Sequence, residues 1–290
     1  MVFTYFRLKK GMKLKYHLIL LIFVNVSSFA TDVLIITHAY NQPDFIEMQI
    51  KGFKKFLADD YEFVVFNDAR NPQIRKQIEI ICGNYNIQCI GIPQEIHDRP
   101  YLQRWPGENN NYPSVRHSNG IMYSLHKLGF NHDGIVCIID SDMFLIKPFS
   151  ITKFLDKFDI AALNQFPGPI NYLWPGLAFM NMKTMPNKET INWNCGRVNN
   201  TVVDTDGQTY HYLKSNSTLR VKYIDICTHN AQILKEAGFD PTGPIRKLFQ
   251  NKETWELLLD FHFLHFYAGS RLPNRPNRKM ILKQFLDSIY

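Results

Sequence analysis

Apolar runs and amphipathic segments alternate along the first third of the chain. Residues 32–37 and 61–66 are rich in β-branched and aromatic side chains, which is typical of buried strands. Apolar side chains recur at helical spacing over residues 43–58 and 72–82, and a further short apolar run covers residues 87–92. This βαβαβ order predicts a Rossmann-like half with parallel strands and right-handed crossovers.

The pattern is less regular in the rest of the chain. Residues 97–112 are polar and turn-rich, which predicts a long irregular loop of the kind that often forms a lid. A helix is expected over residues 113–128, where apolar positions again share one face. Residues 148–158 then predict a short helix, and residues 160–163 and 177–182 predict strands.

The apolar run at residues 134–139 ends abruptly in Asp140-Ser141-Asp142. Because side chains alternate along an extended segment, the two aspartates point the same way and can share one hard cation. That cation could in turn hold a diphosphate, and the carboxyl ends of central strands are where α/β sheets bind ligands. The alternative is a pair of solvated turn residues or helix caps.

The segment Ile138-Ile139-Asp140-Ser141-Asp142-Met143-Phe144 resembles the DxD motif of glycosyltransferases with the GT-A fold. In that family the two acids hold Mn2+ or Mg2+ under the diphosphate of a nucleotide sugar. The resemblance extends from about Thr31 to about Arg278. It implies an α/β, Rossmann-like GT-A fold with a mixed, mostly parallel central sheet flanked by helices.

The length of the chain fits one such unit. A chain of 290 residues with 45% hydrophobic content can bury one sizeable core. We therefore expect a single GT-A catalytic domain over residues 31–290, with a nucleotide-binding half at 31–145 and an acceptor half at 146–290. In the acceptor half, the resemblance implies that the strand at 177–182 runs antiparallel to the strand that carries Asp140.

A second motif lies near the C-terminus, at residues 261–271. It resembles the histidine-containing motif of metal-dependent GT-A families such as the glycogenin-like enzymes. The resemblance implies that His265 completes the metal shell and that Arg271 meets the diphosphate; His262 is the alternative ligand. The chain departs from the glycogenin pattern, because Arg271-Leu272-Pro273 replaces Lys-Pro-Trp and the spacing from histidine to glycine is longer. A lone histidine among aromatic side chains can also be a core residue.

The resemblance further implies contacts to the nucleotide sugar from strand ends and from the helix that precedes the metal strand. Thr37 would touch base and ribose, Asp68 would hydrogen-bond the base edge, and Arg70 would meet the phosphates. The remaining donor contacts would come from Arg116, Asn119 and Ser141. The alternative for these residues is an ordinary role in turns or as solvated surface groups.

Acceptor contacts are expected from the second half of the chain. Tyr172 and Trp174 lie in a turn-rich aromatic segment and are candidates for stacking on a sugar ring, although aromatic side chains are also common in cores. If the enzyme inverts the anomeric centre, a carboxylate must deprotonate the acceptor hydroxyl. Asp206 is the first candidate for this base and Asp204 the second, and the alternative for both is a turn role.

The charge of the chain is concentrated at its start. Of the net charge of +7, five units come from Arg and Lys residues before residue 16, with no acid before Asp32. The rest is nearly balanced, so nucleic acid is not an expected partner. The basic start leads into a short apolar run and small residues at Ser28 and Ala30, which predicts a signal peptide over residues 1–30 or a short signal anchor. Met12 is an alternative start.

These observations together predict a glycosyltransferase that moves a sugar from a nucleotide-sugar donor to a glycan, protein or lipid hydroxyl. Asp140, Asp142 and His265 would hold Mn2+ or Mg2+. We expect the enzyme in the Golgi or endoplasmic reticulum lumen or secreted, with membrane contact only if the N-terminal segment is uncleaved. A secreted glycan-binding protein that kept the fold is the alternative, and a metal-dependent phosphodiesterase is a third reading. In an oxidising compartment, Cys82 could be bridged to Cys89, and Cys195 with Cys227 is a weaker pairing.

Overall fold

The computed structural model describes residues 31–101, 103–165, 169–227, 230–249, 256–259, 261–266 and 276–290. The predicted leader at residues 1–30 lies outside this part of the chain. Among the helices of the described residues, none combines the length and the apolar character that a bilayer crossing requires. The central sheet is built from β1 (Val33–Ala39), β2 (Tyr61–Asn67), β3 (Gln88–Gly91), β4 (Ile135–Asp140), β6 (Ile160–Gln165), β7 (Tyr172–Asn181) and β10 (Val221–Ile224).

The strands of this sheet follow the order β10-β6-β7-β4-β1-β2-β3. Strands β3, β2, β1 and β4 pair in parallel, and β6 and β10 also pair in parallel. Strand β7 runs antiparallel to both of its neighbours, β4 and β6. A mixed, mostly parallel sheet flanked by helices was predicted from the sequence, and this prediction is confirmed.

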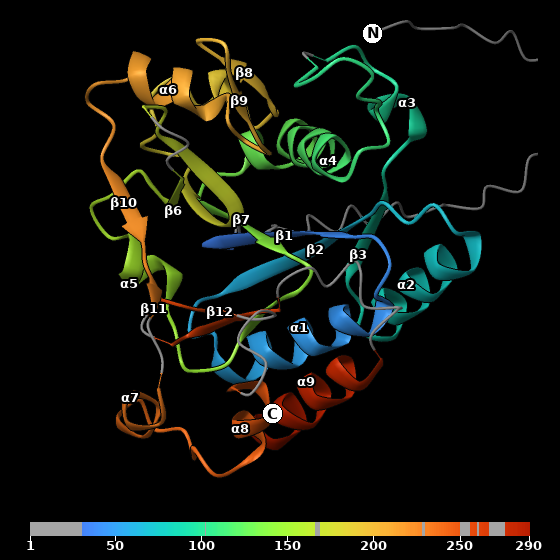
Figure 1. Cartoon of the computed structure of the whole chain (residues 1–290), viewed down its shortest axis with the longest axis vertical. Helices are drawn as coiled ribbons and strands as arrows, with labels where there is room; N and C mark the ends of the chain where they lie inside the picture. The colour runs from blue at the N-terminus through green and yellow to red at the C-terminus, as the bar shows by residue number, and fades with distance from the viewer. Residues whose placement is uncertain are drawn as a thin grey trace, which may run out of the picture.

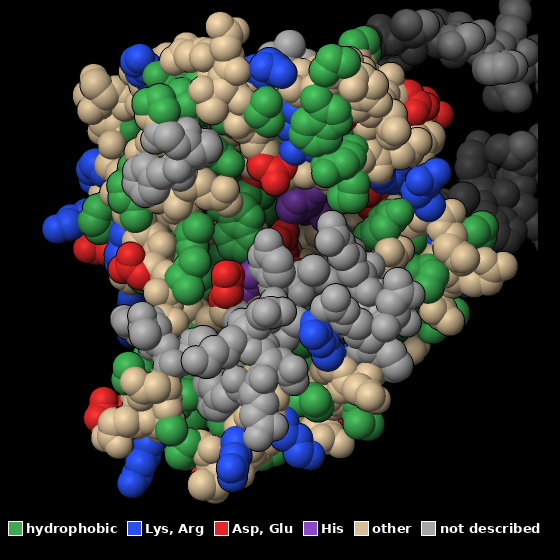
Figure 2. All heavy atoms as spheres, in the orientation of Figure 1, with side chains coloured by type: hydrophobic (Ala, Val, Ile, Leu, Met, Phe, Trp, Pro, Cys, Tyr) green, Lys and Arg blue, Asp and Glu red, His purple; other side chains and the backbone are tan. Residues whose placement is uncertain are grey.

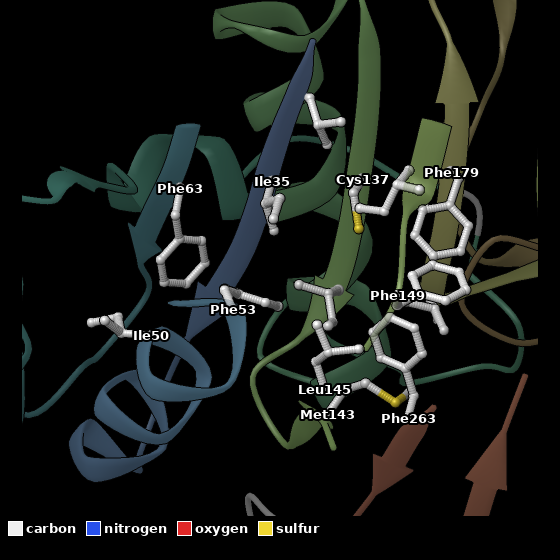
Figure 3. Packing of buried hydrophobic residues seen from close by; sticks show 14 of the residues in the cluster. Ile35, Ile50, Phe53, Phe63, Cys137, Met143, Leu145, Phe149, Phe179 and Phe263 are labelled. Carbon is white, nitrogen blue, oxygen red and sulfur yellow. The ribbon is translucent and has the colours of Figure 1, made fainter. Parts of the chain in front are cut away.

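Helices cover both faces of the sheet (Figure 1). One face packs against α1 (Pro43–Phe56), α2 (Pro72–Asn84) and α5 (Ile151–Leu155), and Figure 3 shows Phe53, Ile35, Cys137 and Phe149 in this core. The other face packs against α4 (Pro113–Lys127) and α6 (Thr209–Ser215). Alternate residues of β1 and β4 point to opposite faces, which explains why these strands read as continuous apolar runs.

A second, four-stranded sheet lies beside the first. Its order is β11 (Ile226–Cys227), β12 (Glu256–Leu258), β13 (Phe263–His265) and β5 (Met143–Leu145), all paired antiparallel. Helix α9 (Pro276–Ile289) lies close to α1 in Figure 1 and packs apolar side chains into the same core as this sheet. Because β4 and β5 are separated only by Ser141 and Asp142, the two sheets meet at the predicted metal motif.

The remaining elements are short. They are α3 (Gln94–His97), the 3-10 turns η1 (Gly129–Asn131) and η2 (Lys188–Thr190), the hairpin β8 (Gly196–Val198) and β9 (Thr201–Val203), α7 (Ala231–Glu236) and α8 (Pro244–Phe249). All five cysteines lie among the described residues and are free thiols, so neither suggested disulfide is formed in this structure.

Two elements differ from the sequence prediction by more than two residues at one end or both. Strand β7 begins at Tyr172, well before residue 177, because a register shift opposite Ala162 and Leu163 accommodates Pro175 within the strand. Helix α5 spans only Ile151–Leu155 instead of residues 148–158. Ser150 caps its start, and Asp156 has a positive φ of 36°, which ends it.

Candidate functional site

Asp140, Asp142 and His265 converge at the junction of the two sheets. Asp140 ends β4, Asp142 follows in the turn, and His265 lies on β13 directly opposite Met143 of β5. One ligand atom from each of the three side chains lies within 4.8 Å of the others. Two carboxylates and one imidazole at this separation fit a divalent cation such as Mn2+.

The backbone of the turn that carries the two aspartates is held by hydrogen bonds from α1 and from the end of β13. Gln49 of α1 is fully buried, and its Nε2 donates to the carbonyl oxygens of Asp140 at 2.8 Å and Met143 at 3.0 Å. On the other side, the backbone N–H of Phe266 donates to the carbonyl oxygen of Asp142 at 2.8 Å. These bonds fix the backbone on both sides of the motif and thereby the direction of its carboxylates.

His265 is held by an acidic partner. Its Nδ1 lies 3.1 Å from Oε2 of Glu256 on β12, while its Nε2 faces Asp142 Oδ1 at 3.7 Å. Burial would lower the pKa of His265, but Glu256 and the two aspartates outweigh it and raise that pKa. The ring of Trp174 packs against the imidazole at 5.2 Å between centroids. A carboxylate behind a ligating histidine is the usual support for a metal ligand, because it fixes the tautomer and the ring orientation.

A second histidine contacts the metal motif from the helix side. His117 of α4 lies with its Nε2 3.1 Å from Asp140 Oδ1, and its ring meets His38 edge-on. Burial opposes the charge on both Asp140 and His117, yet their pairing lowers the pKa of Asp140 and raises that of His117. His38 behaves differently, because burial and the neighbouring His117 lower its pKa to about 3 and keep it neutral. Its Nε2 lies 3.1 Å from the Ser124 hydroxyl.

A cavity of about 420 Å³ opens beside these residues. Figure 2 shows acidic and histidine side chains meeting in a hollow on the face seen there. The wall toward α4 carries Arg116, which is paired with Asp68 at the end of β2. Oδ1 of Asp68 also lies 2.8 Å from His97 Nε2, within hydrogen-bonding distance. A ligand phosphate near Arg116 would therefore compete with Asp68 for the guanidinium group.

Asp206 lies in the turn before α6 and is fully buried. Neither of its carboxylate oxygens has a hydrogen-bond partner among the described residues, and its φ is 72°. Burial, together with the charges of Asp140 and Asp204, raises the pKa of Asp206 well above its usual range. Its neighbour Thr205 lines the cavity, whereas Asp204 is exposed and paired with Arg104. Buried unsatisfied carboxyl groups are uncommon and often mark functional sites.

The structure places the other predicted site residues as follows. Ser141 lines the cavity with the two aspartates, and Thr37 is completely buried within β1. Arg70 is exposed and is not among the described residues that line the cavity. Arg271 lies outside the described residues.

Three further predicted contacts take other surroundings. Asn119 lines a different cavity, on the neighbouring flank of α4. Tyr172 is 3% exposed, and its hydroxyl donates to Gln165 Oε1 at 3.0 Å. Trp174 is only partly buried, against His265.

The residues of the site that were not predicted from the sequence include Gln49, His117 and Glu256. His117 directly follows Arg116 on α4, so the same argument about the helix before the metal strand could have included it. Gln49 and Glu256 carry no such signal, because their roles depend on where a helix and a strand far away in the chain are packed.

Comparison with known proteins gave matches only among solved structures. No protein-family model matches the chain, and no curated protein matches it. The galactosyltransferase LgtC, in complex with donor and acceptor sugar analogs, is similar at 14% identity with a TM-score of 0.43, covering 88% of this chain and 96% of that one. The mannosyltransferase PcManGT from Pyrobaculum calidifontis, in complex with GDP-Man and Mn2+, is similar at 13% identity with a TM-score of 0.43, covering 68% of this chain and 55% of that one.

A third similar structure is glucosyl-3-phosphoglycerate synthase from Mycobacterium tuberculosis, in complex with Mn2+, uridine diphosphate and glucosyl-3-phosphoglycerate. It is 13% identical with a TM-score of 0.40, covering 67% of this chain and 69% of that one. At these identities and TM-scores the similarities carry no argument about activity, so the function has to be inferred from the residues of the site.

Proposed function

We propose that this protein is a metal-dependent glycosyltransferase that takes a sugar from a nucleotide-sugar donor. The observation that carries the proposal is the convergence of Asp140, Asp142 and His265 at the carboxyl end of the central parallel strand β4. Ligands of α/β sheets bind at this edge, and a hard cation held there is suited to a diphosphate.

The charges around the ligand set support a diphosphate. A bound Mn2+ or Mg2+ would neutralise the charge that develops on the leaving nucleoside diphosphate. Arg116 and His117 extend the cationic side of the same cavity, and Arg116 can form a bidentate contact with phosphate oxygens. Gln49 and Glu256 keep the ligands in position, which lowers the reorganisation needed when the cation binds.

The acceptor in this proposal is a hydroxyl group of a glycan, protein or lipid. Asp206 remains our candidate for the base that takes its proton. Because Asp206 is fully buried, this role requires the turn at residues 204–208 to expose its carboxyl group. We further propose that the enzyme works in the secretory pathway or outside the cell, as the basic and apolar start of the chain suggests.

The test is release of free nucleoside diphosphate from a panel of nucleotide sugars, with Mn2+ or with a chelator. The wild type is compared with Asp142→Asn and with Asp133→Asn, a matched change of an exposed aspartate outside the cavity. We expect release that depends on Mn2+, persists in Asp133→Asn and falls at least about a hundredfold in Asp142→Asn, the scale of loss when one group that supports stabilisation of developing charge is removed. If donors bind but none is cleaved, the proposed transferase activity is overturned. Absence of both binding and release would overturn any role of nucleotide sugars and leave the glycan-binding alternative in its place.

A further inference from the structure

A second cavity, of about 640 Å³, lies on the neighbouring flank of α4. Arg116, His117 and Gly120 face the candidate active site, whereas Asn119 and Tyr123 line the second cavity. The division follows the length of the helix, because the residues at the candidate active site come from its first half and most of those at the second cavity from its second half. No described residue lines both cavities.

Part of the wall is a short segment that is rigidly anchored. Trp193 is fully buried, and its backbone N–H donates to the sulfur of Met122 at 3.4 Å. The flanking residues Asn192 and Asn194 both line the cavity, and the backbone N–H of Asn194 donates to Asn192 Oδ1 at 3.0 Å. The buried indole thus anchors the backbone of this segment, and the Asn194 N–H holds the Asn192 amide in place before any ligand arrives.

Helix α4 contributes an amide with unused hydrogen-bonding capacity to the lining of the cavity. Nδ2 of Asn119 is buried and has no hydrogen-bond partner among the described residues. Buried polar groups without a partner are rare in proteins and call for a specific explanation. Since Asn119 lines a cavity of ligand size, a bound molecule with hydroxyl groups would supply the missing acceptor.

The charge of the cavity indicates what kind of molecule this is. Arg99 and Lys127 line it, and none of the described lining residues is acidic. The rings of Tyr101 and Tyr123 add apolar faces next to the amides. Side-chain amides can bind pairs of hydroxyl groups, and aromatic rings can stack on the apolar faces of pyranose rings. The two cationic side chains attract a carboxylate.

We propose that this second cavity is a saccharide-binding site for an acidic sugar, one that carries a carboxylate. The amides of Asn119, Asn192 and Asn194 bind its hydroxyl groups, and Lys127 and Arg99 bind its acid group. The proposal does not depend on the activity proposed above, because no residue of the metal ligand set takes part in it.

The experiment measures binding by NMR titration of the full chain with the methyl glycosides of glucuronic and galacturonic acid. Their neutral counterparts, methyl glucoside and methyl galactoside, lack only the carboxylate, and inorganic phosphate serves as an anion without a sugar. We expect at least one uronide to bind more tightly than its neutral counterpart and than phosphate, with shifts in α4 and residues 192–195. Affinity should fall as salt is added, because the charged residues are exposed.

Two variants locate the site. Asn119→Leu should weaken uronide binding about threefold to tenfold, the value of one hydrogen bond, without lowering the midpoint of thermal unfolding, since the amide nitrogen has no partner to lose. Lys127→Gln should weaken the uronide and leave the neutral sugar unchanged, whereas Lys153→Gln, on α5, should change neither. Equal binding of uronide and phosphate would overturn the saccharide assignment, and equal binding of uronide and neutral sugar would overturn the role of charge. Absence of binding by every uronide, or binding unaffected by Asn119→Leu, would overturn the site itself.

Discussion

Replacement of Gln49 by Met tests how the metal motif is held in place. Gln49 is completely buried on α1, and both of its observed hydrogen bonds go to backbone carbonyls on either side of the Asp140–Asp142 turn. Met has nearly the same length and shape but no donor, so the packing of α1 is kept while the two bonds are removed.

The magnitude follows from those two bonds. A buried hydrogen bond contributes about 0.5–1.5 kcal/mol, so Gln49→Met should lower the free energy of unfolding by about 1–3 kcal/mol. The unpartnered Oε1 of Gln49 is removed as well, which offsets part of this loss. Loss of a group that orients metal ligands typically costs about 10–100-fold in metal affinity, and we expect a loss in that range.

Stability is measured by urea unfolding with a chelator present, and Mn2+ affinity by calorimetric titration. Gln284→Met, an exposed change on α9, is the control and should alter neither quantity. A variant that loses stability but binds Mn2+ as tightly as the wild type would refute the claim that Gln49 positions the ligands.

Two further predictions concern pH. Burial, with the charges of Asp140 and Asp204, raises the pKa of Asp206 in the folded state. As pH rises above about 4, the usual pKa of an aspartate, this residue therefore loses its proton first in the unfolded chain. The free energy of unfolding then falls as pH rises. Relative to Asp206→Asn, the wild type should therefore lose up to about 1.4 kcal/mol of unfolding free energy per pH unit, as measured by urea unfolding with chelator present. A difference between the two proteins that does not change with pH would contradict this. The pKa of Asp159 is shifted in the opposite direction. Burial opposes the charge of Asp159, but hydrogen bonds from Arg220 at 2.9, 3.0 and 2.5 Å outweigh the effect of burial and lower the pKa. Asp159→Asn should lower the free energy of unfolding by about 1–3 kcal/mol at neutral pH. The difference between wild type and variant should close as pH falls below about 4 towards the lowered folded-state pKa. A difference that persists in acid would show that the charge of Asp159 is not responsible.

The elements of the first half were predictable because each has a clean local signal. Strands β1, β2 and β4 are continuous apolar runs, and α1 begins at a proline and carries a regular apolar stripe. The Asp140 and Asp142 pair follows from the same logic, since its place depends only on where β4 ends. His265 was predicted by resemblance, and the structure brings it to within reach of both acids.

The rest depends on packing between distant segments. Pro175 and Gly176 read as a turn, yet the strand continues through them because the register of β6 shifts at that point. Asn119 and Arg116 are three residues apart and were assigned to one ligand, but Arg116 pairs with Asp68 beside one cavity while Asn119 lines another. Gln49 and Glu256 act through backbone carbonyls and a histidine brought close only by the tertiary fold, so no local pattern marks them.

The pairing of β5 with β13 has a consequence for how the protein is made. Synthesis runs from the N-terminus, so β1 to β4 and both aspartates leave the ribosome well before His265 exists. Until β13 is added beside β5, the growing chain carries two carboxylates without the imidazole that completes the set. The three side chains of the candidate cation site therefore come together only after β13 has been translated and the second sheet has closed.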